Sequence, residues 1–116
     1  MTARHGGRRT SATEPFKACV RDWALKLRVE PAQVRVQRMT RKWASCSAAG
    51  RLTFSKGLLR KPERFREYVI VHELLHLRVP NHGRLFRSYL SAYIPGWDSI
   101  ARGPLSLDVP QEDTIL

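Results

Sequence analysis

The stretch that decides the fold is YVIVHELLHL, residues 68–77. Its apolar residues surround a His-Glu-x-x-His pattern, in which His72 and His76 are separated by one helical turn. On an α-helix this spacing places the two side chains about 40° apart around the axis and about 6 Å apart along it, so both imidazoles can reach one metal ion. The pattern predicts a largely buried helix that opens at Pro62, where proline suits a first turn, and is ended by Pro80.

The chemistry expected of this helix is zinc binding. Zinc takes histidine nitrogens at about 2.0–2.1 Å in a tetrahedral array, and a catalytic zinc keeps one position open. His82 is the candidate third ligand, because Pro80 and Asn81 give the chain a reason to leave the helix and turn back toward the metal. Glu73 lies one step around the helix from His72 and can reach a water on the same metal, which makes it the expected general base.

Two other interpretations of these histidines stay open. A histidine on an apolar stripe is often a hydrogen-bonded core residue, and a zinc ion can be purely structural. A His-Glu-x-x-His pattern arises by chance in about 0.5% of chains of this length, and three of the four histidines fall within residues 72–82. A structural zinc normally has four protein ligands with cysteine prominent, and Cys46 alone could contribute here. We therefore favour a catalytic zinc.

Composition limits the class of protein. The chain has 116 residues, 42% of them hydrophobic, which is enough for one domain with a core. The sequence shows no membrane-spanning apolar run and no apolar signal peptide, so we expect a cytoplasmic protein with Cys19 and Cys46 as free thiols. The formal net charge of +11 is compatible with a solvated basic surface and equally with weak nucleic-acid binding.

The segment before the histidine helix predicts a leader and a first helix. Residues 1–13 have almost no large apolar side chains and read as a disordered basic leader. A helix is expected from Glu14 to Arg28, with Pro15 in its first turn. Its apolar side chains recur at intervals of three and four, which places them on one helical face; they are Phe16, Val20, Trp23 and Leu27.

The remaining segments predict two strands and one further helix. Strands are expected over residues 34–39 and 51–55, paired as a hairpin or a sheet edge, with a turn-rich connection over residues 40–50. A helix is expected over residues 83–93, closed by a Pro-Gly pair. Residues 103–116 are expected to form a loosely ordered tail.

Three segments together carry a family resemblance. They are WASCS at residues 43–47, YVIVHELLHL at residues 68–77 and NHGRLF at residues 81–86. In this order they resemble the successive motifs of YgjP-like metallopeptidases, which are similar to the wider set of minimal HExxH zinc peptidases that includes the SprT-like and WLM groups. The resemblance covers roughly residues 14–100, and three motifs are far more specific than one.

The resemblance implies a fold, a site and an activity. The fold would be a compact, minimal zincin-like α+β domain over residues 14–102, with a small antiparallel sheet packed on the active-site helix. His72, His76 and His82 would bind zinc, and Glu73 would be the catalytic residue. The chain would then be a zinc-dependent metallopeptidase that hydrolyses peptide or protein substrates.

Residues 43–47 have an open role. They could form a sheet edge beside the zinc that holds an extended peptide by strand addition. Alternatively, Trp43 and Cys46 could simply fill the core.

Two further questions are left open by the sequence. Tyr89, Tyr93 and Arg41 are candidates for stabilising a developing oxyanion, although aromatic residues at helical spacing are more often core residues. The alternative to a peptidase is a basic nucleic-acid-binding module with a structural zinc site, or a protease associated with DNA.

Overall fold

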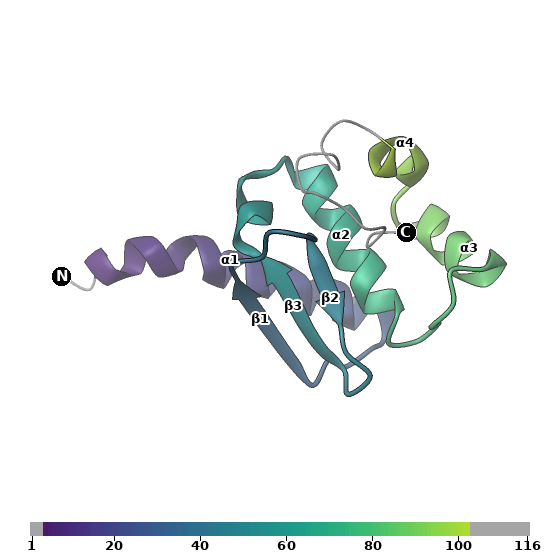
Figure 1. Ribbon diagram of the computed structural model, residues 1–116, viewed down its shortest axis with the longest axis horizontal. Coiled ribbons are helices and arrows are strands. Elements are labelled where there is room, and N and C mark those ends of the chain that lie inside the picture. The colour runs from purple at the N-terminus through teal and green to yellow at the C-terminus, as the bar shows by residue number, and fades with distance from the viewer. Residues whose placement is uncertain (1–3, 103–116) are drawn as a thin grey trace.

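The computed structural model describes the backbone of residues 4–102 and the side chains of residues 12–102. The expected tail, residues 103–116, lies outside the described residues. The elements follow in the order α1 (Arg4–Leu27), β1 (Gln33–Gln37), β2 (Ala44–Cys46), β3 (Arg51–Ser55), the 3-10 helix η1 (Lys56–Arg60), α2 (Glu63–Leu75), α3 (Arg84–Tyr93) and α4 (Trp97–Ala101). The domain is a compact α+β fold, as expected (Figure 1).

The sheet has three strands in the order β1-β3-β2. β2 pairs antiparallel with β3, but β1 runs parallel to β3, with Val34 opposite Leu52. The expectations of an antiparallel sheet and of a hairpin between the first two predicted strands are therefore wrong for β1 and β3. The segment expected to be only a connection contains β2, which runs antiparallel to β3. The chain therefore reverses direction twice between β1 and β3, so these two strands run parallel.

α1 passes behind the sheet and α2 lies next to β2, and the two helices pack against each other (Figure 1). The predicted apolar face of α1 is confirmed for Phe16, Val20 and Leu27, which are all buried. The ring of Phe16 packs edge-on against that of Phe54 in β3, with 5.2 Å between the ring centroids. This contact holds α1 against the sheet, while α2 packs against α1 and β2.

The start of α1 differs from expectation. The helix begins at Arg4 rather than at Glu14, and Pro15 stands inside it instead of in its first turn. Extending a helix that already exists needs less free energy than nucleating one, so a helix held by its buried face can continue outward through a weakly helical sequence. The division of the chain into a leader and a domain from residue 14 onward stays a prediction.

The end of α2 also differs. Regular helix stops at Leu75, before the expected break at Pro80. The next residues form tighter turns, in which the Leu77 amide donates to the Leu74 carbonyl and the Arg78 amide to the Leu75 carbonyl. α3 ends at Tyr93 ahead of the Pro-Gly pair, as expected, whereas η1 and α4 were not predicted. Within the described residues, no helix has the length and hydropathy to cross a membrane.

Candidate metal centre

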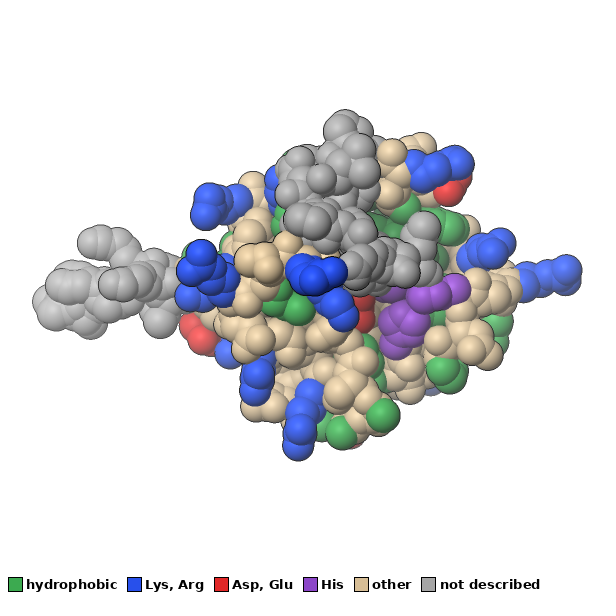
Figure 2. Space-filling view, viewed as in Figure 1, with side chains coloured by type: hydrophobic (Ala, Val, Ile, Leu, Met, Phe, Trp, Pro, Cys, Tyr) green, Lys and Arg blue, Asp and Glu red, His purple; other side chains and the backbone are tan. Residues whose placement is uncertain are grey.

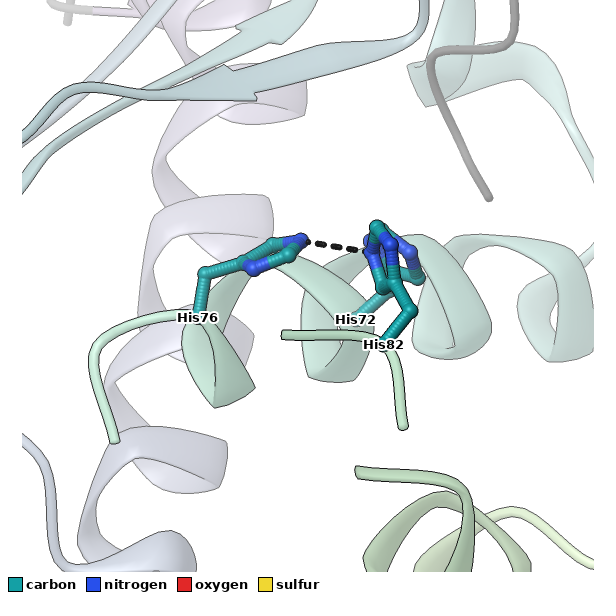
Figure 3. A group of neighbouring side chains, drawn as sticks. All are labelled: His72, His76 and His82. Atoms are coloured by element: carbon teal, nitrogen blue, oxygen red, sulfur yellow. Dashed lines mark hydrogen bonds between the residues drawn. The ribbon is translucent and has the colours of Figure 1, made fainter. Parts of the chain in front are cut away.

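Three imidazoles converge at the end of α2. His72 lies in the last turn of α2, His76 caps the helix, and His82 lies in the loop that leads to α3. One nitrogen from each ring lies within 4.8 Å of one nitrogen from each of the other two. The Nε2 atoms of His76 and His82 are 3.0 Å apart, and Figure 3 shows the three rings turned toward one another. The structure thus brings together the three residues that the sequence proposed as metal ligands.

The loop after α2 returns the chain to the helix. The Val79 amide donates to the Leu75 carbonyl at 2.7 Å, which tightens the turn before Pro80. The chain then reverses, and the ring of His82 comes to lie 4.6 Å, centroid to centroid, from that of His76. The turns after Leu75 and the loop that follows them, rather than a helix that runs up to Pro80, bring the third imidazole back to the end of α2.

Phe86 of α3 forms a wall of the cluster. Its ring is 1% exposed, and its centroid lies 5.3, 5.0 and 4.8 Å from the centroids of His72, His76 and His82. An apolar ring against all three imidazoles limits their rotation and keeps water from one side of the cluster. The sequence analysis missed this role, although the NHGRLF segment that carried the resemblance includes the residue.

Glu73 is a buried carboxylate beside the cluster. It is 3% exposed, and its Oε2 atom lies 3.4 Å from Nδ1 of His72. Within residues 12–102, no lysine or arginine forms an ion pair with it. Burying a charge without a compensating partner is costly. Figure 2 shows the histidines as a purple group at the surface with an acidic side chain next to it.

The environment keeps two of the imidazoles neutral. Burial lowers the pKa of His76, and the neighbouring His72 lowers it further, while Glu73 and a backbone hydrogen bond with Pro80 act in the opposite direction. Burial is also the main reason that the pKa of His82 is lowered, with His72 and His76 adding to the effect. A neutral imidazole is the form that binds a metal.

The cluster fits a divalent cation. Nε2 of His72 is buried and has no hydrogen-bond partner among the described residues, and a metal ion bound through its lone pair would supply the missing partner. A cation here would also compensate the buried charge of Glu73. Three histidine ligands with a fourth position open is one of the donor sets of catalytic zinc sites. His72, His76 and His82 are therefore the residues that would hold the metal.

A cavity of about 590 Å³ opens beside the centre. His72 and His82 form part of its wall, and most of the remaining wall comes from α3 and α4 together with Tyr68 of α2. The rings of Tyr68 and Trp97 are stacked with 6.5 Å between centroids. Burial, with a contribution from Glu73, raises the pKa of the Tyr68 hydroxyl, which stays protonated at neutral pH. The sequence analysis did not single out this tyrosine, because its apolar neighbours made it look like an ordinary core residue.

The other candidates lie elsewhere. Tyr89 lies under the guanidinium of Arg78, 5.3 Å from ring centroid to Cζ, and Tyr93 packs edge-on against Trp23 of α1. Neither tyrosine lines the cavity beside the histidines, and Arg41 does not line it either. Cys46 of β2 is half-buried and does not belong to the metal cluster, although Glu73 is near enough to contribute to a raised pKa of its thiol.

Comparison with known proteins agrees with this geometry. The family described as YgjP-like, metallopeptidase domain, matches residues 6–103. The chain belongs to the YgjP-like metallopeptidase family. Its family membership makes it a metallopeptidase domain, so the alternative of a binding module without activity is not supported. No curated protein matches the chain.

Two solved structures have the same fold. The metallopeptidase zymogen jannalysin of Methanocaldococcus jannaschii is 28% identical, with a TM-score of 0.68 over 73% of this chain and 88% of that one. The metallopeptidase zymogen abylysin of Pyrococcus abyssi is 22% identical, with a TM-score of 0.65 over 73% of this chain and 87% of that one. The YgjP-like chain therefore shares its α+β fold with two archaeal metallopeptidase zymogens.

Proposed function

We propose that this chain is a zinc-dependent peptidase in which His72, His76 and His82 hold the metal and Glu73 is the general base. The observation that carries the proposal is the convergence of three imidazoles beside a buried carboxylate that lacks a lysine or arginine partner within residues 12–102. A bound zinc ion would acidify a water molecule and polarise the scissile carbonyl group.

Glu73 has the surroundings of a proton acceptor. Its carboxylate adjoins the histidine cluster and is buried, with its Oε2 atom 3.4 Å from Nδ1 of His72. Because no lysine or arginine of the described part of the chain neutralises it, the carboxylate is available to take the proton of the attacking water. The same group can then deliver that proton to the leaving amine.

β2 is suited to holding an extended substrate. It forms one edge of the three-stranded sheet, pairs with β3 on one side, and lies next to α2, which carries His72 and Glu73 (Figure 1). An edge strand can bind a peptide by main-chain hydrogen bonds that do not depend on side-chain identity. This arrangement favours the peptide-holding role of residues 43–47 for the edge, while Trp43 itself is buried, as the core interpretation expects.

The cavity beside the metal would receive a side chain of the substrate. Its lining includes the aromatic rings of Tyr68, Phe86 and Trp97. The charged side chains in the lining are Arg87, Asp98 and Arg102. Apolar burial favours a large apolar side chain in such a space. We therefore expect cleavage next to aromatic or long aliphatic residues.

The decisive experiment replaces Glu73 by Gln, which keeps the shape of the side chain and removes its charge. The zinc-loaded variant should bind zinc as the parent chain does and lose peptide cleavage by about 10²–10⁴-fold. The matched control is Glu63→Gln, which removes an exposed carboxylate from the first turn of the same helix and should leave cleavage unchanged. Cleavage at the parent rate by the Glu73 variant would show that this residue is not the base.

A further inference from the structure

A second pocket lies at the end of the sheet where β3 passes into η1. Its volume is about 590 Å³, and it shares no lining residue with the cavity beside the histidines. Its lining residues come from the segment between β1 and β2 and from η1 with its flanking residues. They are Arg38, Met39, Trp43, Ser55, Lys56, Gly57, Arg60 and Lys61. Segments distant in sequence thus build one concave site.

The pocket is strongly positive. Four of its lining residues carry a positive charge, and none carries a negative one. Within residues 12–102, no carboxylate forms an ion pair with Arg38, Lys56 or Arg60. Cations gathered around a hollow focus a positive potential into it and repel one another. A bound anion would remove that repulsion.

The pocket is lined on one side by the indole of Trp43, which is held by contacts with its neighbours. Trp43 is 2% exposed, and the Nζ atom of Lys61 lies 5.4 Å from the centroid of its ring. The Oγ atom of Ser55 accepts a hydrogen bond from the Gly57 amide at 3.1 Å. The indole Nε1 of Trp43 has no acceptor among the described residues, which leaves a buried donor unsatisfied at a cost in stability.

We propose that this pocket binds a phosphate group of a small molecule. A phosphate dianion matches the excess of positive charge better than a single carboxylate does, and arginine side chains donate to phosphate oxygens in pairs. Arg38 and Arg60 supply such donors from two different segments, and Lys56 and Lys61 add point charges. The hollow shape favours a compact ligand over the backbone of a nucleic acid, which an extended basic stripe would suit.

The test is a titration of the zinc-loaded chain with inorganic phosphate at constant ionic strength, followed by amide and indole NMR signals. We expect saturable shifts of the Trp43 indole and of the Lys56 and Gly57 amides, with a Kd at or below about 1 mM. The double variant Arg38→Gln/Arg60→Gln should bind at least about tenfold more weakly, because it loses charge-assisted hydrogen bonds. Both residues are exposed, so the variant should keep a folded spectrum.

The control removes the same charge elsewhere. The double variant Arg21→Gln/Arg51→Gln changes two exposed arginines outside the pocket and should bind phosphate within about twofold of the parent chain. Equal weakening in both double variants, shifts without saturation, or shifts centred on His82 and Gly83 would each overturn the proposal. Binding of a single-stranded oligonucleotide without binding of phosphate would overturn it in favour of a nucleic-acid surface.

Discussion

The Nε2 atoms of His76 and His82 face each other across 3.0 Å, although a helix end and a reversing loop separate the two residues in the chain. In a tetrahedral site with bonds of about 2.0–2.1 Å, two ligand nitrogens are about 3.3 Å apart. The two imidazoles are thus held close to the separation that a shared cation needs. Five experiments follow from this arrangement and from the fold around it.

Removing the third imidazole should weaken metal binding without unfolding the chain. His82 is exposed in the loop before α3, so His82→Ala should keep the circular dichroism spectrum of the parent. Loss of one of three ligands should lower the zinc affinity at least about 100-fold, measured by competition with a chromophoric chelator. Asn81→Ala, at an exposed position next to it, is the control. An unchanged affinity would remove His82 from the ligand set.

Zinc should stabilise the folded chain. Its three ligands come together only in the native structure, so a zinc concentration of 100 times Kd should add about 2.7 kcal/mol to the free energy of unfolding. For a domain of this size, the melting temperature should rise on the order of 10 °C. Calorimetry with and without a chelator measures the change. The His82→Ala variant should show a much smaller rise, and an equal rise in the variant would point to zinc binding elsewhere.

Phe86 should matter for the metal as well as for the core. Phe86→Ala removes a buried ring and should cost about 3–5 kcal/mol of stability in urea unfolding. It should also weaken zinc binding, because the ring packs against all three imidazoles. Leu90→Ala deletes a side chain of the same helix that is equally buried, and it should lose stability with little change in zinc affinity. Equal zinc affinities in the two variants would reduce Phe86 to a packing role.

The thiol of Cys46 should react slowly at neutral pH. Burial raises its pKa above the ordinary value of 9.0, and the negative charge of Glu73 raises it further. The thiolate fraction, and with it the rate of alkylation by iodoacetamide, should therefore be below that of a free cysteine at pH 7 and increase as the pH rises past that value. In a Cys19→Ser background, adding Glu73→Gln should lower the pKa and speed the reaction. A rate at pH 7 equal to that of free cysteine contradicts this account.

Pro15 offers a test of where the folded domain begins. A proline inside a helix is about 3 kcal/mol less favourable than alanine, whereas a proline in the first turn costs little. If α1 persists from Arg4, Pro15→Ala should raise both the helical signal and the free energy of unfolding. If residues 1–13 form the disordered leader expected from the sequence, the same change should be nearly neutral. Circular dichroism with urea unfolding separates the two outcomes.

The metal centre was accessible from the sequence because its spacing is local. His72 and His76 are separated by one helical turn, whose geometry is the same in every α-helix. Pro80 marks a position that the helix cannot pass, although α2 already ends at Leu75. Proposing His82 required one further inference, that the loop after the helix turns back. In the structure, His82 does lie beside His72 and His76. The catalytic role of Glu73 remains a proposal.

The strand pairing of the sheet and the residues that line the two pockets could not be predicted from local spacing in the sequence. β2 is three residues long, and its sequence ASC has no alternation that marks a strand; only pairing with β3 defines it. Three features join segments that are separated in the chain: the parallel pairing of β1 with β3, the contact of Phe86 with His72, and the pocket that Arg38 and Arg60 both line. No local pattern encodes such contacts.

The sequence by itself determined the helix faces, the break after the histidine helix and the set of residues able to bind a metal, because each depends on dihedral preferences and periodicity within a few residues. The tertiary structure alone decided which strands pair and in which direction, and which side chains line the two pockets. Those features depend on how much apolar surface the whole chain buries, which cannot be read from residues that are neighbours in the sequence.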